Sequence, residues 1–323
     1  LQGIPERASV GLQALMQVAE IEPPLDAENI AFGIGPRINA AGRLGQARLA
    51  VELLTTDNAD RARQLAQYLD KLNKDRRTVE HRIFRQAKKQ VGEHPEWEEA
   101  PALVLASSEW HAGVIGIVAN RVVEEFEKPV ILVAISALEG IGKGSGRSFA
   151  GFDLYSGIAA AAEHLEGFGG HHAAAGLTIR ADRIDAFREA FCQHVAAHHE
   201  VTEQDRELAI DAEVGLSELT HQAVVALDVL SPFGQGNPRP RFAAARVELD
   251  QPPKTMGEGD RHLSLSLKSG NGRIRAVAFG RGEWAKQIEA TSGPISICFE
   301  PMINRWRGRE SVELKLIDWR TGE

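Results

Sequence analysis

One uninterrupted helical pattern runs through residues 57–92 of this sequence. Asp57 and Asn58 supply N-cap side chains, and apolar residues then recur every three or four positions up to Gly92: Leu65, Leu69, Leu72, Val79, Ile83 and Ala87. Roughly 33 residues at about 1.5 Å each give a helix of roughly 50 Å, longer than the helices of an ordinary compact domain. Such a helix is typical of a strut between two folded parts, and equally of a coiled-coil partner.

The patterns that follow this helix predict two different kinds of domain. Residues 100–200 alternate short apolar runs such as PALVLAS with helical periods such as GVIGIVANRVVEEF, which predicts an α/β domain. From residue 205, runs of period two such as HLSLSLK and RIRAVAFG flank turn signals, which favours a small β-barrel of the oligonucleotide/oligosaccharide-binding (OB) type. The predicted fold class is α/β plus β, with a long connecting helix over 57–95, an α/β domain over 100–200 and an OB-like barrel over 205–323.

Composition narrows the class of protein further. Apolar residues make up 43% and charged residues 25% of the 323 residues, as in ordinary globular proteins. Cys192 and Cys298 both lie in apolar runs, so we expect core residues in a reducing cytoplasm rather than a disulfide framework. No apolar run approaches the roughly 20 residues of a membrane span, so we expect no membrane partner. The chain begins at Leu1 and reads like the interior of a domain, which suggests a fragment or a processed product.

Charge is unevenly placed along the chain. The net charge is −8, but residues 1–228 carry 22 Lys and Arg against 34 Asp and Glu, whereas residues 229–323 carry 15 against 11. A basic C-terminal part can mark an anionic partner, although a solvated charged surface is the commoner cause.

The stretch FGGHHAAAG, residues 168–176, places two adjacent histidines between glycines and alanines. Adjacent residues in an extended segment point to opposite sides, so His171 and His172 do not easily bind one metal ion, and we expect no metal site. Gly169 and Gly170 would let main-chain N–H groups approach an anion. The pattern favours a loop that contacts substrate, with a structural turn as the alternative.

Three further stretches carry residues suited to phosphate. In SSEWHAGVIGIVANR, Trp110 and His111 precede a helix N-terminus, where anions bind, although Trp110 filling a core and His111 capping the helix is an equal alternative. GKGSGRS resembles a phosphate cradle without matching the P-loop, and a flexible hairpin is its alternative. Its polar residues include Ser145, Arg147 and Ser148, of which Arg147 suits bidentate phosphate binding. RINAAGR offers residues that would clamp a polyanion or decorate a helix start: Arg37, Asn39 and Arg43.

Five stretches together resemble the RecJ family of single-strand-specific 5′→3′ DNA exonucleases, which belong to the DHH superfamily. They are GPRINAAGRLG, SSEWHAGVIGIVANR, GKGSGRSFAGFDL, FGGHHAAAGL and FGQGNPRPRF, and they cover the chain from near residue 1 to near residue 320. FGGHHAAAG resembles the signature of the DHHA1 domain. The family carries its metal ligands in an N-terminal DHH domain named for Asp-His-His, and this chain contains no Asp-His-His. The resemblance therefore implies that residues 1–56 border a DHH domain that is absent from this chain.

The resemblance also implies a function for the parent enzyme. It would hydrolyse phosphodiesters in DNA repair and recombination with Mn²⁺ or Mg²⁺, whose ligands lie outside this chain, so this chain alone would be inactive. Its partners would be single-stranded DNA and its own DHH domain, with a single-strand-binding protein or a helicase as further candidates. The alternatives are a non-catalytic single-strand-binding module or replication scaffold, and a phosphoesterase acting on short oligonucleotides or pyrophosphate.

Roles for individual residues follow from the same resemblance. Near the active cleft, the backbone or 5′ end would be gripped by Arg37, Asn39 and Arg43. The cleft would be lined by His111, His171 and His172, and substrate would be bound there by Trp110, Ser145, Arg147, Ser148, Gly169 and Gly170. In the barrel, phosphate attraction and base stacking would come from Arg239, Arg241, Arg261, Arg273, Arg275, Phe242, Phe279 and Trp306.

Overall fold

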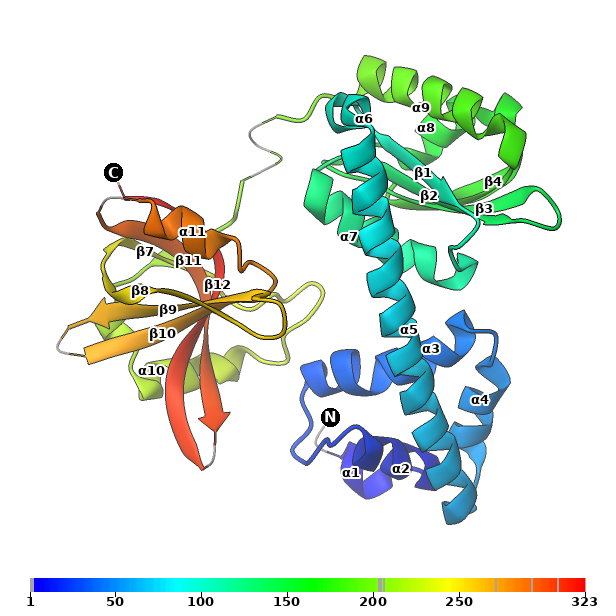
Figure 1. The fold of residues 1–323 in the computed structure, drawn as a ribbon. Coiled ribbons are helices and arrows are strands. Elements are labelled where there is room, and N and C mark those ends of the chain that lie inside the picture. The colour runs from blue at the N-terminus through cyan, green and yellow to red at the C-terminus, as the bar shows by residue number, and fades with distance from the viewer. Residues whose placement is uncertain are drawn as a thin grey trace. The chain divides into compact units, whose positions relative to one another are not determined.

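The computed structural model describes residues 3–202, 205, 207–270, 272–291, 293–306 and 308–322. The chain divides into two compact units, with the boundary between residues 206 and 207 (Figure 1). The first unit combines helices with a five-stranded sheet, and the second is built around a seven-stranded sheet. The predicted class of α/β plus β with a long connecting helix is confirmed. No helix among the described residues is long and apolar enough to cross a membrane.

The long helix is α5, Ala59–Glu93, which begins where the Asn58 side chain accepts a hydrogen bond from the Arg61 amide at 3.0 Å. Its first half packs into a core with short helices that precede it, and its second half packs against α7 and the sheet. These short elements are α1 (Ile4–Arg7), α2 (Val10–Val18), η1 (Asn29–Ile34), α3 (Gly35–Arg43) and α4 (Ala47–Thr55). Helix α5 therefore joins two hydrophobic cores of one unit, as a strut does.

The sheet of the first unit has the order β1-β2-β3-β5-β4. Its strands are β1 (Leu103–Ser107), β2 (Val130–Ser136), β3 (Ile141–Arg147), β4 (Leu165–His171) and β5 (Ala174–Arg180). Strands β1 and β2 are parallel and are connected through α7, Ala112–Phe126, while the other pairs are antiparallel. Helices α5 and α7 cover one face, and α8 (Leu154–Ala160) and α9 (Ile184–His198) cover the other (Figure 1). The short helix α6, Pro95–Glu99, links α5 to β1.

Glycines at alternate positions of β3 make room for the core beneath α8 and α9. A Cβ added at Gly142 would lie 2.5 Å from a Val133 methyl, and one added at Gly144 would lie 2.5 Å from Leu177. Because side chains alternate along a strand, Ser145 and Arg147 emerge on the opposite face, toward α7. The GKGSGRS stretch is therefore a packed central strand, and the alternative of a flexible hairpin is wrong.

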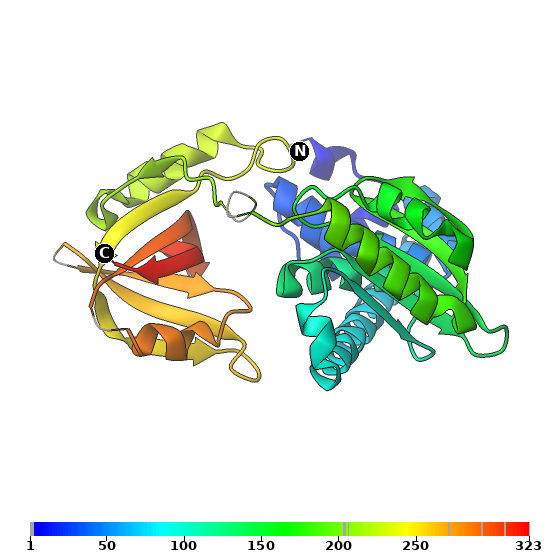
Figure 2. The same ribbon diagram turned by 90° about the horizontal axis from the view of Figure 1, so that it is seen from above.

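The second unit is a closed barrel (Figure 2). Its strands are β6 (Ala212–Glu213), β7 (Phe242–Val247), β8 (Leu249–Met256), β9 (His262–Ser269), β10 (Gly272–Ala278), β11 (Ile295–Trp306) and β12 (Arg309–Thr321). A single residue separates β7 from β8, and the two pair with β11 and β9 respectively, which closes the order β8-β9-β10-β12-β11-β7. Strand β9 shows the expected period two, with Leu263, Leu265 and Leu267 buried. Helices α10 (His221–Ala226) and α11 (Trp284–Glu289) complete this unit.

Candidate nucleic-acid interface

The C-terminal residue of α3, Arg43, contacts Gly113 in the first turn of α7. Gly113 donates its amide to His111 Nδ1 at 3.1 Å, so His111 caps α7. A Cβ on Gly113 would lie 2.0 Å from the carbonyl oxygen of Arg43, and Arg43 Nη1 donates to the Gly113 carbonyl at 3.3 Å. Two stretches that lie far apart in the sequence are therefore in direct backbone contact.

One turn further along α7, Gly116 opens a space that two side chains of β3 occupy. A Cβ on Gly116 would lie 3.0 Å from Ser145 Oγ and 3.1 Å from Arg147 Nη2. Arg147 Nη1 donates to Ser145 Oγ at 3.1 Å and to the Gly146 carbonyl at 2.7 Å. The β3 arginine is thus held against the first turns of α7, whose Gly113, Val114 and Ile115 amides already donate to His111, so the arginines supply the positive charge here.

Three arginines come near one another here, Arg43, Arg76 and Arg147, and among the described residues only Arg76 has a carboxylate paired with it. Burial lowers the pKa of Arg147, and the positive charge of Arg43 lowers it further. Burial also lowers the pKa of Arg76 on α5, against the attraction of Glu80, and Arg43 contributes to the same lowering. Among the described residues, no carboxylate pairs with Arg147, and Arg76 Nε has no hydrogen-bond partner. We call Arg43, Arg76, Arg147 and Ser145 the cationic cradle.

Glu80 is the carboxylate that pairs with the cradle among the described residues. It binds Arg76 at 2.9 Å and Arg121 of α7 at 3.1 Å, so its single charge is shared between two arginines. A half-buried cluster of like charges is costly unless an anion joins it. The geometry therefore suits a phosphate group bound at the start of α7.

The FGGHHAAAG stretch forms the β4–β5 hairpin beside the cradle. Gly170 has a φ of +146°, and a Cβ there would lie 2.5 Å from the Ala174 carbonyl oxygen, so this position requires glycine. Ala174 pairs in register with Arg147, and the Ser148 amide donates to the Ala173 carbonyl at 3.0 Å. The turn with its two exposed histidines thus lies next to the end of β3.

The two histidines are not arranged as a ligand pair. His171 Nδ1 accepts from the Ala173 amide at 3.3 Å, and the His172 carbonyl accepts from the Leu154 amide at 3.0 Å. Within the described ranges, no group of three or more His, Cys, Asp or Glu is placed to hold a metal ion.

The structure corrects two of the predicted substrate contacts. Arg37 binds Asp70 of α5 through Nε at 2.9 Å and Nη2 at 2.8 Å, which ties α3 to α5. Trp110 is 5% exposed in the core, and its indole N–H donates to Gln86 at 3.1 Å, so the core-filling alternative is correct. Trp110 fills the core from the bend that precedes α7, and Arg37 is held by its ion pair with Asp70.

The roles expected for Asn39, Ser148 and Gly169 remain predictions. Asn39 is exposed on α3. Ser148 Oγ donates its single proton to the Phe152 carbonyl at 2.5 Å, so it would have to break that bond to donate to a phosphate. Gly169 lies in β4 opposite Gly176 of β5.

Sequence reasoning missed Arg76. It occupies a position of α5 where the spacing of Leu69, Leu72 and Ile83 calls for an apolar residue. An arginine at a position where an amphipathic helix faces inward could have identified Arg76 as a candidate binding residue.

A polar hollow of about 450 Å³ lies on the barrel surface over β8, β9 and β10, and Arg273 and Arg275 line it with Lys254, Ser264 and Ser266. Arg275 binds Glu313 at 2.9 Å and Ser264 Oγ at 3.1 Å, while Arg273 is exposed. OB folds bind oligonucleotides over their second and third barrel strands, which here are β9 and β10. The two predicted arginines therefore share one face suited to a nucleic-acid strand.

The other predicted barrel residues lie elsewhere. Arg239 stacks on Phe233 at 4.7 Å, and Arg241 on the β7 side donates to Glu300 at 3.4 Å. Arg261 and Phe279 are exposed. Phe242 packs against the barrel core, which corrects the stacking role predicted for it. The side chain of Trp306 lies outside the described residues.

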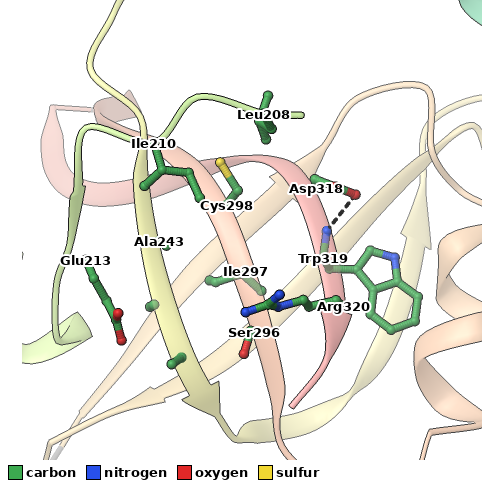
Figure 3. A pocket seen from close by; sticks show the side chains of 12 residues that line it. Leu208, Ile210, Glu213, Ala243, Ser296, Ile297, Cys298, Asp318, Trp319 and Arg320 are labelled. Carbon is green, nitrogen blue, oxygen red and sulfur yellow. Dashed lines mark hydrogen bonds between the residues drawn. The ribbon is translucent and has the colours of Figure 1, made fainter. Parts of the chain in front are cut away.

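A second hollow of about 260 Å³ lies on the outer face of β7, β11 and β12 (Figure 3). Small side chains, including Ala243, Ser296 and Cys298, form its floor, and Leu208 and Ile210 lie along one side. Its carboxylates include Asp318, which accepts from the Trp319 amide at 2.8 Å. Arg320 lines the hollow together with the carboxylates of Glu213 and Asp318, so its charges are mixed, and none of the predicted substrate-binding residues lines it.

Comparisons with known proteins agree with both units. The DHHA1 domain family matches residues 99–197, and the RecJ OB domain family matches residues 210–318. The single-stranded-DNA-specific exonuclease RecJ of Bacillus subtilis is 32% identical over 293 residues, which are 90% of this chain and 36% of that protein.

Two solved structures of RecJ from Thermus thermophilus, one with Mg²⁺ and one with Mn²⁺, are 34% identical to this chain with a TM-score of 0.82. They cover 99% of this chain, which spans 47% and 45% of their respective chains. The chain thus spans between a third and a half of the length of these relatives.

The fold and these matches define a protein that joins a DHHA1 domain to an OB barrel. Within that class, the chain belongs to the RecJ family.

Proposed function

We propose that this chain is the substrate-binding part of a single-strand-specific 5′→3′ DNA exonuclease that acts in repair and recombination in the cytoplasm. The observation that carries the proposal is the cationic cradle, in which Arg43 and Arg147 lie against Gly113 and Gly116 of α7, and Arg76 of α5 adds a charge that Glu80 pairs. Phosphodiester hydrolysis would need a DHH domain outside this chain. Mn²⁺ or Mg²⁺ held there would supply an activated water.

The cradle would hold a phosphate of the strand and fix its position. Arg147 offers a planar guanidinium that Ser145 and the Gly146 carbonyl already orient, so little side-chain freedom is lost when phosphate binds. The exposed His171 and His172 at the hairpin turn would donate hydrogen bonds to the same nucleotide. The barrel face with Arg273 and Arg275 would bind nucleic-acid backbone as well.

A binding assay tests the cradle. Fluorescence anisotropy with a short 3′-labelled oligonucleotide should show Arg147→Gln binding roughly 10- to 150-fold more weakly, because one charge-assisted contact is lost. Arg180→Gln is the matched control, since Arg180 is exposed and paired with Asp182. Equal affinities for both variants would contradict the proposal.

A nuclease assay tests the missing chemistry. We expect this chain alone to leave 5′-labelled single-stranded DNA intact in Mn²⁺. If this chain degrades the DNA and His171→Ala abolishes that activity, hydrolysis takes place in this chain. That result would refute the proposal that hydrolysis needs a separate DHH domain.

A second candidate is a non-catalytic single-strand-binding module or replication scaffold. It is favoured by the missing Asp-His-His and by the lack of a metal-binding cluster among the described residues. The two candidates differ in one result: adding the DHH domain from a RecJ protein should restore exonuclease activity only under the first. Under either candidate, a single-strand-binding protein or a helicase would be a further partner.

A further inference from the structure

One side of α5 carries basic residues that the cradle does not use. Lys71, Arg82, Arg85 and Lys89 are all exposed and lie on the side of the helix opposite its buried leucines. Their spacing of 11, 3 and 4 residues returns to the same side at 3.6 residues per turn, so they form one line. At about 1.5 Å per residue this line is roughly 27 Å long. We call these four residues the α5 stripe.

The charge of α5 runs against that of its surroundings. Residues 1–228 carry 22 Lys and Arg against 34 Asp and Glu, yet the 35 residues of α5 carry ten against five. The remainder of that region is therefore strongly acidic, and the positive charge is concentrated on this helix. A general excess of lysine and arginine does not explain this distribution.

The stripe is poorly neutralised by its neighbours. Five other cations of α5 have carboxylate partners, such as Lys74 with Asp70 at 2.8 Å, although none pairs with Arg77 among the described residues. Lys89 binds Glu93 at 3.5 Å, but among the residues that the structure describes no carboxylate pairs with Lys71, Arg82 or Arg85. Because Arg82, Arg85 and Lys89 are three or four residues apart, their like charges destabilise the helix. A bound polyanion would relieve that repulsion.

The chemistry of the stripe favours nucleic acid over protein. Protein interfaces depend on aromatic or apolar anchors in fitted pockets. Along the same line the stripe offers only Asp75 and Thr78 between its cations, both exposed. A row of exposed cations without anchors matches a phosphate backbone, which is bound through charge and without reading sequence.

We propose that the α5 stripe is a second, sequence-independent binding surface for the phosphate backbone of a nucleic-acid strand. This proposal rests on the proposed function only in that nucleic acid is the ligand. The stripe is a separate surface, since Arg76 of the cradle lies on the opposite side of α5. A long strand bound at the cradle, or an adjacent segment of DNA, would contact it.

The test compares oligonucleotides of two lengths with the full 323-residue chain. Anisotropy is measured from about 50 to 200 mM salt with 3′-labelled oligo(dT) of about 6 and about 40 nucleotides. For the triple variant Lys71→Gln, Arg82→Gln, Arg85→Gln, the salt slope for the long strand should fall by about 2, since each single-strand contact contributes about 0.7. Binding of the short strand should not change. Asp75→Asn should tighten binding of the long strand.

The matched control removes the same charge from other exposed positions through Arg48→Gln, Arg180→Gln and Arg183→Gln. An equal loss in this control would show that net charge alone matters and would overturn the proposal. An unchanged slope in the stripe variant would also overturn it and would leave an acidic protein as the partner of the stripe.

The two proposals fail separately. If Arg147→Gln weakens binding of both strands and the stripe variant weakens neither, only the stripe proposal is lost. If the unaltered chain binds neither strand, both are lost.

Discussion

Gly116→Ala separates the stability of α7 from binding at the cradle. Gly116 lies in the helix interior, where alanine is favoured over glycine by about 0.5–1 kcal/mol. The added Cβ would lie 3.0 Å from Ser145 Oγ and 3.1 Å from Arg147 Nη2, and both atoms end side chains that can shift by a few tenths of an ångström. We therefore expect the variant to keep most of this gain, with a melting temperature higher by about 1–4 °C.

The same methyl group should weaken phosphate binding. It occupies the space into which the Arg147 guanidinium is held by Ser145 and the Gly146 carbonyl. Displacing that guanidinium weakens a charge-assisted hydrogen bond worth about 1.5–3 kcal/mol, and its complete loss, roughly 10- to 150-fold in affinity, sets the upper limit of the effect. Stability and affinity should thus move in opposite directions.

Thermal unfolding and anisotropy with a short oligonucleotide measure the two effects. Gly92→Ala is the matched control, because Gly92 lies near the end of α5 with open space around its Cα and far along the chain from the cradle residues. It should raise stability and leave affinity unchanged. Unchanged affinity for Gly116→Ala would refute the cradle as the phosphate site, and a large fall in melting temperature would refute the steric reasoning.

Three further changes test the packing that supports the two interfaces. Gly170→Ala should destabilise the chain by about 1–3 kcal/mol in urea unfolding, because the residue has a positive φ and no room for a Cβ. Arg275→Leu leaves the buried Glu313 without its closest cation at 2.9 Å, so calorimetry should show the barrel losing about 1–2 kcal/mol. Burial raises the pKa of Asp70, but the hydrogen bonds and charges of Lys74 and Arg37 outweigh it and hold that pKa below its usual value. This carboxylate therefore stabilises the fold above its unfolded pKa of about 3.9, and the contribution is lost as pH falls through its folded pKa. Arg37→Gln should be less stable than the unaltered chain at pH 7, and the difference measured by urea unfolding should shrink below about pH 4.

The fold class could be predicted from local patterns because each pattern reflects local geometry. The period of Leu65 through Ala87 predicts α5, and the period two of HLSLSLK predicts β9. GKGSGRS was harder, because its glycines suggest flexibility when read alone. They are required instead by Val133 and Leu177, residues that only the folded sheet brings against them. Sequence position carries no information about such partners.

The site could be predicted only in part, for a related reason. Arg147 and Ser145 were predicted from the chemistry of their own stretch, and the structure adds Arg76 from a helix that the sequence presents as a strut. Arg37 and Trp110 carry suitable chemistry but face inward, toward Asp70 and Gln86. Whether an arginine binds a ligand or a neighbouring carboxylate depends on which element packs beside it.

Glycines, more than cations, locate the cradle within the first unit. Arginines occur throughout α5, but the cradle forms where α7 has glycines. Gly113 lets Arg43 approach the α7 backbone, and Gly116 lets Arg147 approach it one turn later. Arg37, one helical face away from Arg43, has a carboxylate beside it and is neutralised. A phosphate binds where cations are close together and have no paired carboxylate, as Arg43 and Arg147 do among the described residues. Close glycine contacts between elements therefore predict this site better than the count of basic residues. The exposed α5 stripe lacks such contacts, so it should hold a strand by charge alone, with the stronger salt dependence of the two surfaces.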